Sequence, residues 1–179
     1  MLKKLGAVLL GVGLCLPYSC DVRPISGVWG NLPGILFLGL PVLAAVAYVL
    51  HTLIPPLAAF HERNGRVLHG ILRVLYFGLA GAYLAKALTK NADWPGLLSV
   101  AASLVVTGML LIWQQGRGTK ATRVPLMFLL CASVPMIAYA VELRTDLGIG
   151  AGFVLAGWVL GVLGETQMLR VQPTIAHGG

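Results

Sequence analysis

Two histidines are spaced so that they could face each other across a pair of helices. His51 and His69 lie near the ends of two long apolar runs that a short polar turn joins. Facing histidines are the residues that hold a haem iron from both sides. A haem-binding redox subunit is therefore one alternative. The simpler interpretation is two histidines at a membrane interface, each making ordinary hydrogen bonds, with no cofactor.

Three charged side chains in or next to apolar runs are the other candidates for a ligand or partner contact. Arg73 and Lys86 lie in the same run, and Glu142 ends a later one. The simpler interpretation places Arg73 and Lys86 at opposite membrane faces, where long cationic side chains reach water, with Glu142 near the depth of Lys86. The functional alternative is a buried Arg73 that faces a partner or an anionic ligand.

The sequence carries no motif that favours an enzyme or a metal site. It has no Ser-His-Asp spacing, no phosphate-binding loop and no His-Glu-x-x-His. No acid lies in the middle of an apolar run, which argues against ion-coupled transport. The three cysteines form no Cys-x-x-Cys pair and no zinc-like cluster with histidine.

Glycines in the last apolar run give the clearest packing signal. Gly148 and Gly152 form one Gly-x-x-x-Gly pair, and Gly157 and Gly161 form another. Small residues at this spacing let two helices approach closely in lipid. The sequence leaves open whether the partner helix belongs to this chain or to another subunit.

These candidates must be positioned by long apolar segments. The chain is 58% hydrophobic and 11% charged, against about 25% charge in an ordinary soluble domain. A chain of this length could not hide so much apolar surface from water. We therefore expect an all-α, polytopic transmembrane bundle of about six helices, over residues 5–16, 34–54, 67–88, 97–113, 124–141 and 147–164.

The first twenty residues have three open fates. Residues 1–20 begin with Lys3 and Lys4 and continue into a short apolar core, as export signals do. The segment is retained as a short first helix, or is cleaved, or is cleaved with a lipid attached to Cys20. Residues 16–20 resemble a bacterial lipoprotein box at Ser19 and Cys20 but not at the two positions before them. We favour retention; cleavage would leave five helices.

The distribution of positive charge predicts the topology. With six helices, nine Lys and Arg residues fall on one side and four on the other. The more positive side of a membrane protein faces the cytoplasm. We therefore expect both termini inside, a membrane domain over residues 21–164 and a polar cytoplasmic tail over 165–179. The net charge of +7 then reflects topology, so nucleic acid is not an expected partner.

The functional expectation is a small integral protein of the cell membrane, and specifically of a bacterial inner membrane. Its short loops favour a structural or accessory role, in which it packs against partner subunits as a homo- or hetero-oligomer. The alternative is a small oligomeric transporter or permease subunit for an anionic or amphipathic solute, with Arg73 recognising the solute.

Overall fold

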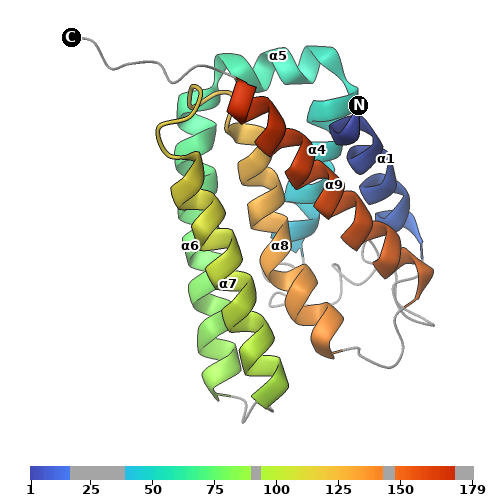
Figure 1. The fold of residues 1–179 in the computed structure, drawn as a ribbon, viewed down its shortest axis with the longest axis vertical. Coiled ribbons are helices and arrows are strands. Elements are labelled where there is room, and N and C mark those ends of the chain that lie inside the picture. The colour runs from blue at the N-terminus through green and yellow to red at the C-terminus, as the bar shows by residue number, and fades with distance from the viewer. Residues whose placement is uncertain (17–38, 90–93, 143–147, 172–179) are drawn as a thin grey trace.

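The computed structural model describes residues 1–16, 39–89, 94–142 and 148–171. These ranges hold seven α-helices and no strand (Figure 1). The expected all-α fold is thereby confirmed for the described part of the chain. The helices are α1 (Leu2–Cys15), α4 (Leu40–Leu53), α5 (Pro55–Arg63), α6 (Gly65–Thr89), α7 (Trp94–Gln114), α8 (Val124–Glu142) and α9 (Ile149–Val171).

Six of these helices overlap the six apolar runs, of which residues 34–38 and 147 lie outside the described ranges, and α5 is an additional helix. The segment after Ile54 was expected to be a turn. Ile54 is extended, with φ −112° and ψ 101°, as the residue before a proline prefers. Pro55 and Pro56 then occupy the first turn of α5, where a missing N–H costs nothing. The helix α5 meets α4 at 111° and lies across one end of the bundle (Figure 1).

The last helix continues further than expected. Residues 165–171 belong to α9 rather than to a tail, and Glu165 and Leu169 within them are buried. The physical reason is that Glu165, Gln167, Met168 and Arg170 all favour helix. The remaining residues expected to form the tail lie outside the described ranges.

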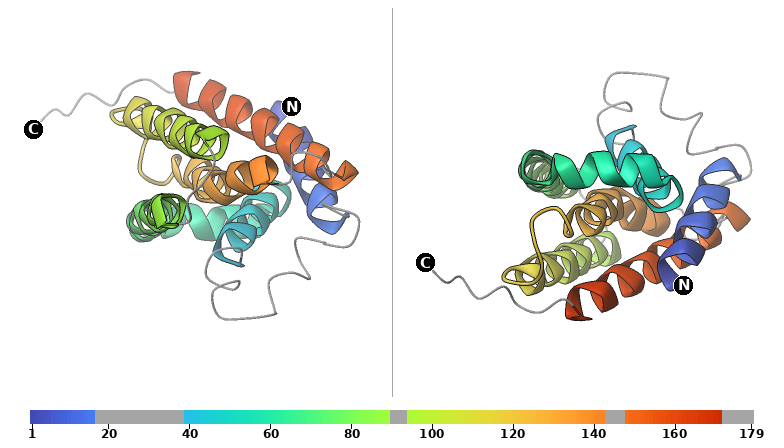
Figure 2. Two further views of the ribbon diagram at one scale, coloured as in Figure 1. Left: turned by 90° about the horizontal axis from the view of Figure 1, so that it is seen from below. Right: turned by 90° about the horizontal axis from the view of Figure 1, so that it is seen from above.

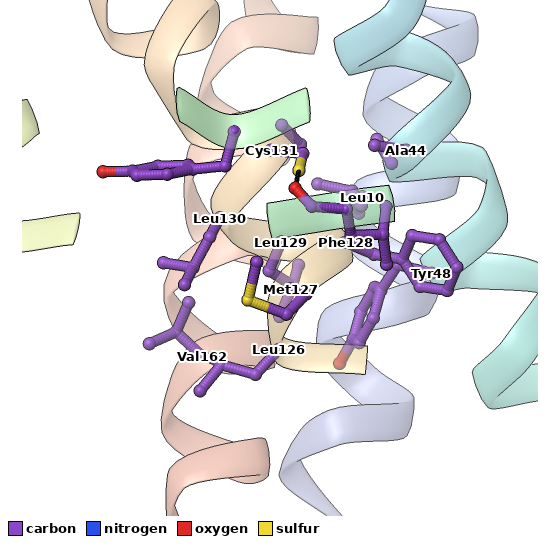
Figure 3. Packing of buried hydrophobic residues seen from close by; sticks show 14 of the residues in the cluster. Leu10, Ala44, Tyr48, Leu126, Met127, Phe128, Leu129, Leu130, Cys131 and Val162 are labelled. Carbon is purple, nitrogen blue, oxygen red and sulfur yellow. Dashed lines mark hydrogen bonds between the residues drawn. The ribbon is translucent and has the colours of Figure 1, made fainter. Parts of the chain in front are cut away.

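Helix α8 is the centre of the bundle. It packs against α4, α6, α7 and α9, and residues 124–133 are all buried (Figure 2). A helix that is apolar on every side is expected to be surrounded in this way. Leu126, Met127 and Leu129 of α8 are fully buried, and Tyr48 of α4 lies beside them (Figure 3).

Helices α1 and α9 touch through their backbones. A Cβ added at Gly6 of α1 would lie 2.5 Å from the Gly161 nitrogen, and one added at Gly157 of α9 would meet the backbone of Leu10. A Cβ added at Gly13 of α1 would likewise lie 2.6 Å from the Val154 nitrogen of α9. Only glycine permits such an approach, so these residues fix how α1 lies on α9.

Trp158 of α9 is tied to the central helix by a single hydrogen bond. Its Nε1 donates to the Leu129 carbonyl oxygen of α8 at 2.9 Å. Trp158→Phe keeps an aromatic ring there but removes the donor, and is expected to lower the free energy of unfolding by about 1 kcal/mol. Thermal unfolding of the purified protein in detergent measures this change. An unchanged melting temperature would mean that the bond contributes nothing.

One helix in the described ranges, α9, is by length and composition able to cross a membrane. The bent pair α4 and α5 is a second candidate if it is taken as one broken span.

Candidate functional site at the basic end

Most of the described cationic side chains belong to segments that meet at one end of the bundle. The chain start, α5, the loop between α7 and α8 and the end of α9 all lie there (Figure 1). We call this the basic end. Its cationic residues are Lys3, Lys4, Arg63, Arg66, Arg117, Lys120, Arg123 and Arg170.

A cleft of about 790 Å³ opens at the basic end, between the α5–α6 junction and the α7–α8 loop. Four cationic side chains line it, accompanied by one carboxylate, that of Glu62. We call it the basic cleft, and its cationic residues are Arg63, Arg66, Lys120 and Arg123. The excess of positive charge suits it to an anionic group.

Glycine brings the two walls of the basic cleft together. A Cβ on Gly65, the first residue of α6, would collide with Ala121 of the α7–α8 loop. Gly116 and Gly118 give that loop its path, with φ values of 81° and 62° that other residues rarely adopt. The cleft is therefore set by backbone contact and does not depend on long side chains alone.

Two arginines hold the α7–α8 loop in shape. Arg123 donates from Nε to the Arg117 carbonyl oxygen at 2.7 Å and from a terminal nitrogen to the Gly118 carbonyl oxygen at 3.0 Å. Arg117 donates to the Trp113 carbonyl oxygen at 2.8 Å, and its guanidinium lies over the Trp113 ring at 4.1 Å from the centroid. Both guanidinium groups thus have a structural role in the loop.

The other three cations of the basic cleft are uncommitted. Within the described ranges, the side chains of Arg63, Arg66 and Lys120 form no hydrogen bond or ion pair. All three residues are exposed. Their charges are therefore available to a ligand.

A second polar group lies beneath the basic end, between α1, α4 and α9. Glu165 is only 4% exposed, and its Oε1 has no hydrogen-bond partner. Lys3 of α1 and Tyr48 of α4 are near enough to interact with it electrostatically. The Tyr48 hydroxyl donates to the Lys3 carbonyl oxygen at 3.5 Å, which links α4 to the start of α1.

A pair of stacked imidazoles joins α4 to α5. The Nδ1 atoms of His51 and His61 lie 3.1 Å apart, and the ring centroids are 5.3 Å apart. His61 also contacts the ring of Phe128 on α8. Burial lowers the pKa of His61 below its ordinary value, because the charged imidazolium would lose its water. With both rings neutral, the Nδ1–H of one imidazole donates a hydrogen bond to the Nδ1 of the other, and this bond holds α5 against the bundle end.

The structure does not bring His51 and His69 together. His51 pairs with His61, and no hydrogen bond or ring contact joins it to His69 among the described residues. His69 is buried on α6, and its Nε2 has no partner. Axial haem ligands need no direct contact with each other, so the haem alternative for His51 and His69 stays a prediction.

Arg73 lies on the outside of α6. Arg73 is exposed, and within the described ranges its side chain forms no hydrogen bond or ion pair. Lys86 and Glu142 belong to α6 and α8, but their side chains lie outside the described part of the structure, as does Cys20. The expected roles of these three residues remain predictions.

The four glycines of the two Gly-x-x-x-Gly pairs have different surroundings. Gly157 and Gly161 face the rest of this chain: Gly157 meets α1, and a Cβ on Gly161 would lie 3.0 Å from the Tyr48 hydroxyl. Gly152 has no atom within 4 Å of an added Cβ. Gly148 immediately precedes α9 and accepts from the Ala151 N–H.

Glu165 is the polar residue that the sequence interpretation placed least well. It was assigned to the tail, yet it is buried against the start of α1. A signal was present, because Glu165 follows Gly157 and Gly161 at intervals of four residues and so shares their helix face. The basic cleft had no comparable signal, since its walls are far apart in the sequence.

Comparison of the chain with protein-family models, with curated proteins and with solved structures gives no match in any of the three.

Proposed function

We propose that this chain is a small multi-pass integral membrane protein with a structural or accessory role, and that its basic end faces the cytoplasm. The observation that carries the proposal is that eight of the described cationic residues gather at one end of a bundle of apolar helices. Positive charge at one membrane face is the strongest determinant of orientation for short loops. In this arrangement α1, α4, α6, α7, α8 and α9 cross the bilayer.

Helix α5 fits the membrane surface in this proposal. It lies nearly across the direction of α4, at 111°, and it joins the basic end. Phe60 and Arg63 are exposed on it, whereas His61 points into the bundle. A short helix with an apolar and a charged exposed residue is suited to the boundary between headgroups and acyl chains.

The outer surfaces of α6 and α7 support a lipid environment. Large apolar side chains are exposed along both helices, and a water-soluble bundle would hide surfaces of this extent. They are Val67, Ile71, Val74 and Phe77 on α6, and Val105, Val106, Met109 and Ile112 on α7.

Two glycines on α6 support the accessory role. A Cβ at Gly78 or Gly81 would meet no atom within 4 Å. Glycine inside a helix costs about 1 kcal/mol relative to alanine. Among the residues that the structure describes, no close approach explains the glycines at these positions. A helix of another membrane protein could approach α6 closely there, which is the use that lipid-facing glycines serve.

The orientation is tested by cysteine labelling in a variant whose three native cysteines are replaced by serine. Gln115→Cys places a thiol in the α7–α8 loop at the basic end, and Asn91→Cys places one between α6 and α7. A membrane-impermeant maleimide applied to spheroplasts is expected to label Asn91→Cys at once and Gln115→Cys only after permeabilisation. Recovery of the protein in the soluble fraction would refute the membrane proposal.

The accessory role is tested by native mass spectrometry after mild detergent extraction. Wild-type protein is expected to carry a partner, and Gly81→Leu is expected to lose it without a change in its own melting temperature. Gly152→Leu is the matched control, because it is equally open but lies on α9. Detection of the wild-type chain without any bound partner would count against the accessory role, but it would not affect the proposed orientation in the membrane.

A further inference from the structure

The three uncommitted cations of the basic cleft call for an anionic partner. Arg63 and Arg66 flank the Asn64 turn, and Lys120 faces them from the α7–α8 loop. Like charges gathered around one cavity repel each other, and an anion placed between them relieves that repulsion. Arg123 completes the lining, but two of its nitrogens already serve loop carbonyls.

The donor set suits a phosphate. Guanidinium groups bind phosphate through two parallel hydrogen bonds, and a lysine ammonium adds a point charge. The cleft is also larger than one anion requires, since about 790 Å³ is the size of an ordinary small-molecule pocket. The phosphate is therefore expected to carry a further group into the cleft.

An apolar track leads away from the same cleft. Val67 lines the cleft and is 65% exposed. Ile71 and Val74 follow it at helical spacing on the same face of α6 and are 58% and 74% exposed. Gly70 comes between Val67 and Ile71 in the sequence, and an added Cβ there would meet no atom within 4 Å. A water-soluble phosphate ester would make no use of this track, whereas an acyl chain would lie along it.

We propose that the basic cleft binds the phosphate of an anionic phospholipid, with the glycerol in the cleft and an acyl chain along Val67, Ile71 and Val74. Arg66 and Lys120 hold the phosphate from opposite walls, and Arg63 adds charge at the rim. The inference goes beyond an accessory role, because the lipid site belongs to this chain alone and needs no partner protein.

The test is native mass spectrometry of the full chain in a neutral maltoside detergent. The probes are dioleoyl phosphatidic acid, dioleoyl phosphatidylcholine and glycerol 3-phosphate. Wild-type protein is expected to bind one phosphatidic acid at least tenfold more tightly than phosphatidylcholine, with no displacement by glycerol 3-phosphate. Arg66→Gln and Lys120→Gln are each expected to weaken binding about tenfold, the loss typical of one charge-assisted contact.

The matched control removes charge at the same end but outside the cleft. Lys4 and Arg170 are exposed and do not line the basic cleft. Lys4→Gln and Arg170→Gln are each expected to change the affinity for phosphatidic acid less than twofold. Ile71→Ser tests the acyl track and is expected to weaken phosphatidic acid several-fold. Equal losses in control and cleft variants would overturn the proposal in favour of unspecific attraction. Displacement by glycerol 3-phosphate would overturn the lipid source and assign the cleft to a soluble phosphate ester.

Discussion

Gly157→Leu is expected to abolish the packing of α1 on α9 and to destabilise the protein by about 3 kcal/mol or more. A side chain at this position meets the Leu10 nitrogen, and its Cβ would lie 2.8 Å from the Gly6 carbonyl oxygen. Both obstacles are helix backbone, which cannot rotate away as a side chain can. The two helices would have to separate along much of their length.

A graded series distinguishes this mechanism from a general effect of glycine replacement. Gly157→Ala is expected to be strongly destabilising, because the first carbon already collides. Gly161→Ala is expected to be milder, since its Cβ would meet side-chain atoms of Tyr48 and Leu129 at 3.0 Å and 3.1 Å. Gly152→Ala has no neighbour within 4 Å and is expected to be neutral or to stabilise by up to about 1 kcal/mol.

Thermal unfolding followed by size-exclusion chromatography in detergent measures the series. The expected order of melting temperatures is Gly152→Ala, then Gly161→Ala, then Gly157→Ala, with Gly157→Leu eluting as aggregate. Equal stability of Gly157→Ala and Gly152→Ala would show that α1 does not lie on α9 as described.

The apolar runs were sufficient to locate most helices, because long uncharged segments have few alternatives to helix. The apolar runs did not predict the helix α5. A Pro-Pro pair ends one helix and starts the next equally well, so Pro55 and Pro56 read as a turn. The burial of His61 against Phe128, which anchors α5, depends on a residue far along the chain.

The Gly-x-x-x-Gly pairs indicated that another helix approaches closely, but they did not indicate which helix it is. Gly157 and Gly161 indicate a close helix contact wherever the other helix comes from. That the partner is α1 depends on Gly6 and Gly13, which read in isolation as part of an export signal. The basic cleft is similar: it forms only because Gly65 lets the α7–α8 loop approach α6 at Ala121.

We expect α1 to be retained in the mature protein, and we expect its removal to have the second large effect on stability. Ala7, Leu10 and Leu14 of α1 are buried, and its backbone covers the glycine face of α9. Cleavage would leave that face of α9 open and would remove the Lys3 carbonyl that accepts from Tyr48. The intact mass of protein purified from membranes is therefore expected to include residues 1–16.

A chain that lacks residues 1–16 is expected to lose most of its stability, on the order of 5 kcal/mol, which is the whole stability of many domains. The measurement is the yield of monodisperse protein after detergent extraction, with the full chain beside it. Gly6→Leu should reproduce the loss from the α1 side, since its Cβ would lie 2.5 Å from the Gly161 nitrogen. Val8→Leu, an exposed neighbour on α1, is the control and should behave as wild type. A purified mass that begins at Cys20 with an attached lipid would contradict retention, and the bundle would then have to hold together without the contact that α9 makes with α1.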